Sequence, residues 1–268
     1  MTEYGYLGGM TKYSNNYNKS LLFRIKRSNK EKINSIDNHQ SFYGHDLWNA
    51  YELSWIGKNR KPNIAVAEII YSCNSKYIIE SKSLKLYLNS FNGSIFQSHD
   101  HVINTIKEDL SAKLEVVVKV SLIDINNKIS SYIPQGYNID HSYQENYSFF
   151  TITTSKYIYV KDETLYSHLL RSNCPVTMQP DWGTIIIHYS GLKIDQTSLL
   201  GYIISLREVN EFQEQCIERI YMKILRSCTP DSLEVFGKYT RRGGIDINPF
   251  RSSHNTINIY KNWRTFRQ

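Results

Sequence analysis

A cysteine and an aspartate seven residues apart are the residues of this chain best suited to covalent chemistry. Cys174 and Asp181 belong to the segment 172–182, SNCPVTMQPDW, which we expect between a short helix and a strand. Two prolines stiffen this segment, and loops held on a rigid scaffold often carry function. A thiol becomes a nucleophile when a neighbouring group takes its proton. From the spacing alone, however, a small buried cysteine beside a turn-forming aspartate is the commoner arrangement.

Two other segments have the composition of phosphate-binding sites. The segment 80–83, ESKS, is predicted to open a helix, where hydroxyls, backbone N–H groups and a lysine suit an anion. An ordinary helix cap is the alternative there. The segment 241–244, RRGG, lies between two predicted strands, and arginines beside glycines can approach a phosphate closely. A charged hairpin turn is the alternative for this segment. Neither GxGxxG nor GxxxxGK[ST] occurs, so neither usual nucleotide-binding fold is indicated.

The remaining residues with chemical potential are weaker candidates. Glu214 is predicted in the first turn of a helix over 211–228, where it could bind the amidine-like edge of a purine. An acid that complements the helix dipole is the commoner case at such a position. Cys73, Cys216 and Cys228 fall on apolar faces and are expected in the core. No CxxC and no zinc-like Cys/His spacing occurs, so we expect no metal.

Composition and charge narrow the class of protein. Hydrophobic residues make up 41% and charged residues 21% of the 268 residues, which is typical of a globular chain. The net charge of +7 favours an anionic partner, either nucleic acid or a phosphorylated cofactor. The basic residues are scattered rather than gathered in a tail, which weakens the nucleic-acid interpretation. No apolar run suits a membrane helix and no secretory signal begins the chain, so we expect a cytoplasmic protein.

The elements that must position these residues are predicted in the same order twice. Each half of the chain has the pattern strand, helix, helix, strand. The strands are predicted at 64–73, 115–124, 183–190 and 232–240, and the helices at 80–92, 100–114, 211–228 and after Asp195, which can cap the fourth. The first 45 residues are polar and weakly periodic, and we expect them to form an arm with little regular structure.

The similarity of the two halves extends to individual residues at an offset of 115. The aligned pairs are Glu80 and Asp195, Ser83 and Ser198, Leu84 and Leu199, Tyr87 and Tyr202, and Ser90 and Ser205. This pattern indicates an internal duplication of an α+β domain, with a pair of antiparallel helices packed on an antiparallel sheet. The expected boundaries are an N-terminal arm at 1–45, a first module at 46–160 and a second module at 161–268.

Taken together, these segments resemble the NADPH-dependent nitrile reductases of queuosine biosynthesis, which convert 7-cyano-7-deazaguanine to its aminomethyl form. The matching strings are YELSW at 51–55, ESKSLKLYLNSFN at 80–92, SNCPVTMQPDW at 172–182, EFQEQCIERI at 211–220 and YTRRGGIDINPFRS at 239–252. The matches run from about residue 41 to residue 253. The chain is similar to the long, two-module form, because the nucleophile lies in the second half and the ESKS string in the first.

The resemblance implies a fold, a reaction and an assembly. The fold is the tunnelling fold (T-fold), in which duplicated α+β units assemble into barrel-like homodimers or higher homo-oligomers. In the implied reaction, the Cys174 thiolate attacks the nitrile carbon, and Asp181 takes the thiol proton and returns it to the nitrogen. The resulting thioimide is reduced by two hydrides from NADPH. The partner is therefore a small-molecule substrate, with neither direct nucleic-acid binding nor a membrane.

The resemblance also implies which residues bind the two ligands. Ile79, Glu80, Ser81, Gln213 and Glu214 would bind the substrate, and Ser81, Lys82, Arg242 and Gly243 would bind NADPH. The Lys82 and Arg242 positions come from opposite halves of the chain, so the cofactor is expected across an interface between modules or subunits. One position departs from the family, which typically has His-Glu where this chain has Gln213-Glu214. Glutamine can hydrogen-bond but cannot carry a proton at neutral pH.

Two other classes of function remain open at this point. A purine- or pterin-type cyclohydrolase on the same fold would need zinc ligands, and the sequence has no convincing Cys/His set. A non-enzymatic tRNA-binding module could use the basic charge and the many tyrosines, and its affinity would fall steeply with salt. Such a module would not need the cysteine and aspartate of the segment 172–182. NADPH oxidation that depends on the nitrile separates these classes.

Overall fold

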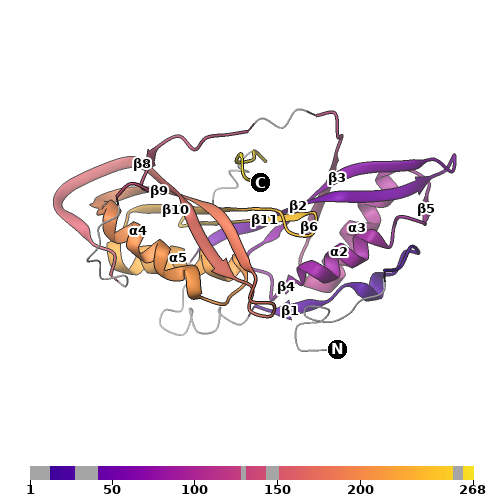
Figure 1. Cartoon of the computed structure of the whole chain (residues 1–268), viewed down its shortest axis with the longest axis horizontal. Helices are drawn as coiled ribbons and strands as arrows, with labels where there is room; N and C mark the ends of the chain where they lie inside the picture. Colours follow the sequence, from indigo (N-terminus) through magenta and orange to yellow (C-terminus); the bar gives the residue numbers. More distant parts are fainter. Residues whose placement is uncertain (1–12, 28–41, 128–130, 143–150, 256–261) are drawn as a thin grey trace. The chain divides into compact units, whose positions relative to one another are not determined.

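The computed structural model describes residues 13–27, 42–127, 131–142, 151–255 and 262–268, which divide into two compact units (Figure 1). Among the described residues, unit 1 contains 13–27, 45–127 and 241–246, and unit 2 contains 42–44, 131–142, 151–240, 247–255 and 262–268. The units are therefore interleaved in sequence, unlike the continuous modules that the repeat predicts. Residues 241–246 group with unit 1 because they contact its strands. For example, the Tyr51 N–H donates to the Gly244 carbonyl at 2.9 Å.

Unit 1 is built on three long antiparallel strands in the order β2, β3, β6. Strand β2 (Tyr43–Gly57) pairs with β3 (Pro62–Ser72), and β3 pairs with β6 (Val118–Ile123). The short β5 (Ile95–Phe96) adds to the end of β2 in parallel. Between β3 and β6 the chain forms helices α2 (Ser81–Asn89) and α3 (His99–Leu114). The 3₁₀ turn η1 (Lys19–Leu21) is followed by β1 (Arg24–Lys26), which pairs with β4 (Tyr77–Ile79).

Helix α3 shows why the helices of unit 1 form where the sequence predicts them. Ser98 caps its N-terminus, with the Oγ atom accepting from the His101 N–H at 3.1 Å. Val102, Ile106, Leu110 and Leu114 are fully buried, and their spacing of four places them on one face of the helix. This apolar face covers β6. The helix ends at Glu115, which adopts the left-handed conformation with φ of 57°.

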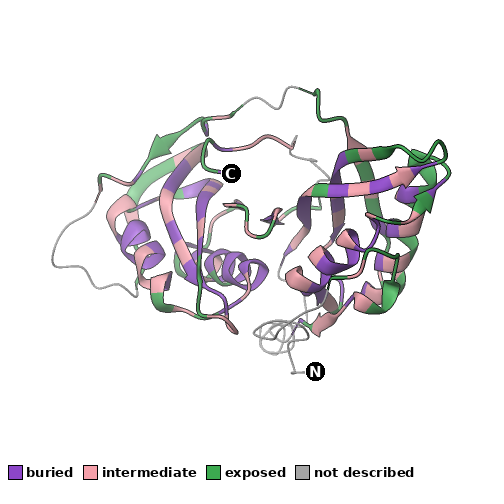
Figure 2. Ribbon diagram, turned by 45° about the vertical axis from the view of Figure 1, so that its right-hand side comes forward, coloured by how far each residue is buried: buried purple, intermediate pink, exposed green. Residues whose placement is uncertain are grey.

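Unit 2 repeats this order with longer strands. Strands β8 (Thr154–Asn173), β9 (Pro180–Ile194), β10 (Ser232–Tyr239) and β11 (Ile245–Ser252, in unit 2 from residue 247) pair antiparallel in that order. The short β7 (Tyr137–Asn138) adds to β8 in parallel. Helices α4 (Gln196–Ser205) and α5 (Gln213–Cys228) lie between β9 and β10, with the 3₁₀ turn η2 (Leu206–Glu208) after α4. Figure 2 colours the helices of unit 2 largely as buried. The buried residues of α5 include Cys216 and Cys228, which the sequence predicts in the core.

Equivalent hydrogen bonds form at the start of α2 and at the start of α4. Glu80 accepts from the Ser83 N–H at 2.8 Å, and Asp195 accepts from the Ser198 N–H at 2.7 Å. In each helix the serine hydroxyl donates back to the carbonyl of its cap, at 2.7 Å in α2 and 2.9 Å in α4. Each serine Oγ also accepts a backbone N–H from an extended segment outside the helix, Phe23 at 3.0 Å and Thr153 at 3.1 Å. The offset of 115 residues therefore aligns equivalent positions.

The α+β class is confirmed, and two local expectations are corrected. No short helix precedes Cys174, because β8 runs to Asn173 and pairs with β9 as far as Pro180. The described part of the N-terminal arm contains η1 and β1, because Phe23 and its neighbours hydrogen-bond to the start of α2. None of the helices in the described residues has both the length and the apolar composition that a membrane span requires.

Candidate active site

The hairpin between β8 and β9 holds the cysteine and the aspartate that the sequence selects. Asn173 lies opposite Pro180, and Ser172 lies opposite Asp181. The turn closes when the Cys174 N–H donates to the Gln179 carbonyl at 2.9 Å and the Met178 N–H donates to the Cys174 carbonyl at 3.1 Å. Cys174 and Asp181 are 2% and 6% exposed. Asp181 therefore lies opposite Ser172, two residues before Cys174 in the chain, and both the Cys174 and Asp181 side chains are shielded from water.

The same hairpin is attached to the start of α5. The Asn173 N–H donates to the Val209 carbonyl at 2.9 Å, and the Glu211 N–H donates to the Asn173 carbonyl at 3.0 Å. Helix α5 begins two residues later, so Gln213 and Glu214 stand in its first turn in the same unit as Cys174. These hydrogen bonds bring segments that are about forty residues apart in the sequence to one place in unit 2.

Both predicted residues at the start of α5 are buried polar groups. Gln213 is 8% exposed and Glu214 is 2% exposed. Within the described part of the chain, the Gln213 side-chain Oε1 atom accepts no hydrogen bond. An acceptor left without a donor in a buried position is costly. The N-terminal end of the helix dipole also favours a carboxylate at Glu214.

Two further titratable groups, Cys216 and Tyr239, interact with residues of this hairpin, and the sequence predicted Cys216 only as a core residue. Cys216 is completely buried, and burial, reinforced by the charge of Glu211, raises the pKa of its thiol to about 12. Burial also raises the pKa of the Tyr239 hydroxyl far above its usual value, and the charges of Cys216 and Asp181 act in the same direction. Cys216 and Tyr239 are therefore protonated at neutral pH, and Tyr239 is within electrostatic reach of Asp181.

Glu211, which precedes α5, is another buried acid that the sequence analysis did not select. Its carboxylate accepts from the Arg219 Nε–H with both oxygens, at 3.0 and 2.9 Å. Burial raises the pKa of Glu211, and the Arg219 charge opposes that shift. The pair joins the segment before α5 to the second turn of the helix, and it therefore orients the turn that carries Gln213 and Glu214.

The predicted substrate residues of unit 1 lie where β4 passes into α2. Ile79 is the last residue of β4, and it lies opposite Arg24 of β1. Glu80 is completely buried, and its two oxygens accept from the Lys82 and Ser83 N–H groups at 2.6 and 2.8 Å. Ser81 begins the helix and is only partly buried. A buried carboxylate held by two N–H donors at a helix N-terminus is a fixed negative charge.

The predicted phosphate residues lie close to the same helix. Arg242 and Ile245 exchange backbone hydrogen bonds at 2.9 and 3.3 Å, and Gly243 and Gly244 between them have φ of 63° and 77°. Two central residues with positive φ form a tight hairpin turn that requires glycine. A Cβ atom on Gly243 would lie 3.2 Å from the Lys85 Cδ atom of α2. The turn therefore packs against α2 within unit 1, the unit that also contains Lys82.

The strings at 51–55 and 239–252, which the sequence analysis found far apart, meet within unit 1. Asp246 accepts from the Asn49 side-chain amide at 2.8 Å and from the Tyr51 hydroxyl at 2.5 Å. The Arg241 guanidinium lies 4.4 Å from the centre of the Tyr51 ring. These contacts fix the glycine turn to strand β2.

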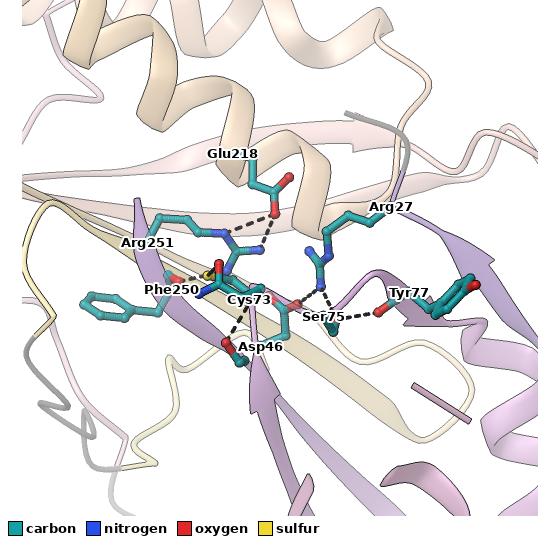
Figure 3. A network of polar contacts seen from close by, with 10 residues as sticks. Arg27, Asp46, Cys73, Ser75, Tyr77, Glu218, Phe250 and Arg251 are labelled. Atoms are coloured by element: carbon teal, nitrogen blue, oxygen red, sulfur yellow. Dashed lines mark hydrogen bonds and ion pairs between the residues drawn. The ribbon is translucent and has the colours of Figure 1, made fainter. Parts of the chain in front are cut away.

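Each unit also contains a buried ion pair that no sequence pattern indicated (Figure 3). In unit 1 the Arg27 Nη2 atom lies 2.6 Å from the Asp46 Oδ2 atom, and in unit 2 the Arg251 Nη2 atom lies 2.7 Å from the Glu218 Oε1 atom. All four side chains are fully buried. Because the side chains are fully buried, removing either charge of a pair would leave the other charge buried without it and would destabilise the fold. Among the described residues, no three His, Cys, Asp or Glu side chains gather as metal ligands.

Comparison with known proteins defines the class. A family model described as "Nitrile reductase, 7-cyano-7-deazaguanine-reductase N-term" matches residues 13–122, and one described as "QueF-like protein" matches residues 180–258. Proteins named NADPH-dependent 7-cyano-7-deazaguanine reductase are similar over nearly the whole chain. The relative from Coxiella burnetii (strain CbuK_Q154) is 47% identical over 98% of this chain and 96% of its own length.

Two further relatives of the same name extend the comparison. The protein from Legionella pneumophila (strain Lens) is 44% identical over 98% of this chain and 94% of its own length. The protein from Burkholderia pseudomallei (strain 1710b) is 44% identical over 99% of both chains. This chain therefore belongs to the family of NADPH-dependent 7-cyano-7-deazaguanine reductases, as the resemblance indicated.

Proposed function

We propose that this chain catalyses the NADPH-dependent reduction of the nitrile of 7-cyano-7-deazaguanine to 7-aminomethyl-7-deazaguanine, a step of tRNA queuosine biosynthesis. The observation that carries the proposal is the β8–β9 hairpin, in which the buried Cys174 lies at the turn, two residues beyond Ser172, the ladder partner of the buried Asp181. A buried thiol beside a buried carboxylate is an arrangement for nucleophilic attack with proton transfer. Family membership makes the nitrile the electrophile.

Cys174 is the proposed nucleophile and Asp181 the proposed proton carrier. The thiol sulfur forms a bond to the nitrile carbon, one π bond of the nitrile breaks, and the thiol proton passes through the Asp181 carboxylate to the nitrogen. The product is a thioimide, whose carbon accepts hydride more readily than a nitrile does. Splitting a difficult step in this way is the usual benefit of a covalent intermediate. The shielded hairpin also keeps water away from the adduct.

Substrate recognition is assigned to the two buried glutamates and their neighbours. Glu80 and Glu214 are acceptor-only groups when ionised, and each stands at a helix N-terminus. Such carboxylates suit the N–H donors at the pyrimidine edge of the deazaguanine. Gln213 offers an acceptor at Oε1 and a donor at its amide nitrogen, and Ile79 and Ser81 flank Glu80. Gln213 has no proton to lend at neutral pH, so the Asp181 carboxylate carries the proton transfer.

The residues proposed for NADPH fit a phosphorylated cofactor by the chemistry of their donors. Lys82 supplies a cation beside Ser81, and Arg242 supplies a fork of N–H donors beside Gly243, whose missing side chain leaves backbone exposed next to α2. When bound, NADPH supplies the hydride. Lys82 and Arg242 belong to one unit, so binding through them requires no interface between modules.

We also propose a specific fold and a state of assembly for the chain. Each unit has two long antiparallel strands, two helices and a third long strand, and this order supports assignment to the T-fold with two tandem modules. Members of such a fold close their sheets by association, so we propose a homodimer or a higher homo-oligomer in the cytoplasm. Size-exclusion chromatography with light scattering measures the oligomer directly.

The test of the function has two parts. Purified protein is mixed with NADPH, and the loss of NADPH absorbance on oxidation is followed with and without the nitrile. Oxidation that depends on the nitrile is expected. Separately, the protein is incubated with the nitrile alone and its intact mass is measured. One added substrate mass is expected for the wild type and none for Cys174→Ala, whereas an adduct on Cys174→Ala would exclude Cys174 as the nucleophile.

A further inference from the structure

Three arginines surround the indole ring of Trp182, the residue that follows Asp181 on β9. The guanidinium carbons of Arg171, Arg207 and Arg267 lie 5.3, 5.1 and 5.9 Å from the ring centre. All three distances fall within the range of cation–π contacts. The arginines come from β8, from η2 and from the segment 262–268, so three separate parts of unit 2 direct a positive charge toward one ring.

Local contacts hold two of these guanidinium groups in place. Arg171 lies directly opposite Trp182 in the β8–β9 ladder, and its Nη2 atom donates to the Asn173 Oδ1 atom at 3.2 Å. The Arg267 Nη1 atom donates to the His168 carbonyl at 3.0 Å. The next residue, Gln268, is buried and donates from its amide nitrogen to the Tyr239 carbonyl at 3.0 Å. The arginine fork is therefore preorganised by the sheet.

Acidic partners for the three arginines are missing within the described residues. None of the three forms an ion pair there, and neither does Glu208, the exposed acid next to Arg207. Asp181 projects to the opposite face of β9, because its ladder partner is Ser172 and that of Trp182 is Arg171. The Arg171 Nε atom is buried and donates to none of the described residues. Three positive charges around one ring repel one another, and an anion among them offsets that repulsion.

From this arrangement we infer that Arg171, Arg207 and Arg267 form a binding site for the phosphate groups of a nucleotide. Arginine forks donate paired hydrogen bonds to phosphate oxygens, and a multiply charged anion offsets the mutual repulsion of the three cations. The indole ring keeps the guanidinium planes in position without adding a competing acid. The nucleotide is either the cofactor itself or a separate phosphorylated nucleotide, and the two sources share this chemistry.

The test measures binding without turnover, so its outcome does not depend on the proposed reductase activity. Adenosine 2′,5′-bisphosphate is titrated into the full chain by calorimetry, with adenosine as the probe that lacks phosphate. Arg207→Gln and Arg267→Gln are each expected to weaken bisphosphate binding about ten- to hundredfold, the usual effect of removing a hydrogen bond to a charged group. Arg226→Gln is the matched control, because Arg226 is an exposed arginine of α5 outside the cluster.

The results assign or exclude the site. Thermal unfolding of each variant first shows that it folds, and Arg267 is exposed, so its replacement leaves the core intact. If Arg207→Gln and Arg267→Gln bind the bisphosphate as tightly as the wild type or Arg226→Gln, the inference is wrong. If both bind more weakly, a raised apparent NADPH constant identifies the cofactor as the ligand, and an unchanged constant identifies a separate nucleotide.

Discussion

The buried ion pair between Glu218 and Arg251 gives the sharpest prediction on stability. Both side chains are fully buried, and the Glu218 Oε1 atom accepts from Arg251 at 2.7 Å from Nη2 and 3.2 Å from Nε. Glu218→Gln keeps the shape of the side chain and removes its charge. The Arg251 guanidinium then remains in the interior without the Glu218 charge, and breaking a buried pair in this way is costly.

The expected size of the effect follows from that burial. Removing one partner of a fully buried pair costs roughly 3–5 kcal/mol of unfolding free energy. With a urea slope of about 1–3 kcal/mol per molar, the midpoint of the transition that reports unit 2 should fall by at least about 1 M. Glu115→Gln makes the same chemical change in the exposed pair with Arg24, whose side chains are 44% and 34% exposed, and should cost less than about 1 kcal/mol.

Urea unfolding followed by circular dichroism measures the midpoint for both variants and for a third, double variant. Arg251→Met combined with Glu218→Gln removes both buried charges, so it should recover most of the stability that Glu218→Gln loses. Equal midpoints for Glu218→Gln and Glu115→Gln would refute the reasoning, because burial would then make no difference. A double variant less stable than Glu218→Gln would show instead that packing of the side chains, rather than charge, governs this position.

The remaining predictions concern the candidate site. Asp181→Asn should slow formation of the Cys174 adduct by roughly 10²–10⁴-fold in time-resolved mass spectra, and an unchanged rate would remove Asp181 from the mechanism. Lys82→Gln and Arg242→Gln should raise the apparent NADPH constant more than the apparent nitrile constant, and steady-state kinetics showing the reverse would contradict their placement. Gln213→His should change the pH–rate profile more than substrate affinity, because it introduces a group that titrates near neutrality, and superimposed profiles would leave position 213 without a role in proton transfer. Because burial raises the Cys216 pKa to about 12, unfolding free energy should decline as pH rises above about 9, where the unfolded thiol ionises first, and Cys216→Ala should decline less steeply in urea titrations at each pH.

The helices were predictable from the sequence because their signals are local. Ser98 and Asp195 are caps that act within three residues, and the buried residues of α3 and α5 repeat every fourth position. The duplication was visible for the same reason, since Ser83 and Ser198 serve the same hydrogen bonds in both copies. The course of β8 was not predictable, because its pairing with β9 decides the conformation of residues whose own pattern is ambiguous.

The residues of the candidate site were predictable only where they lie close together in the sequence. Cys174 and Asp181 could be selected together because one short segment carries both. Tyr239 and Cys216 could not be connected with Asp181, since β10 and α5 reach it only through the folded sheet. The three arginines around Trp182 were equally hidden, because Arg171 and Arg267 are distant in the sequence and no spacing rule joins them.

The glycine turn at 241–246 has a consequence for how the two copies of the repeat depend on each other. Its Asp246 receives hydrogen bonds from Asn49 and Tyr51, and its Gly244 carbonyl receives one from the Tyr51 backbone. A first half expressed alone, ending near residue 160, would leave the Asn49 amide and the Tyr51 hydroxyl without these acceptors. The first half of the repeat therefore depends on a turn that the second half encodes, and cutting the gene between the two copies would remove these hydrogen bonds from unit 1.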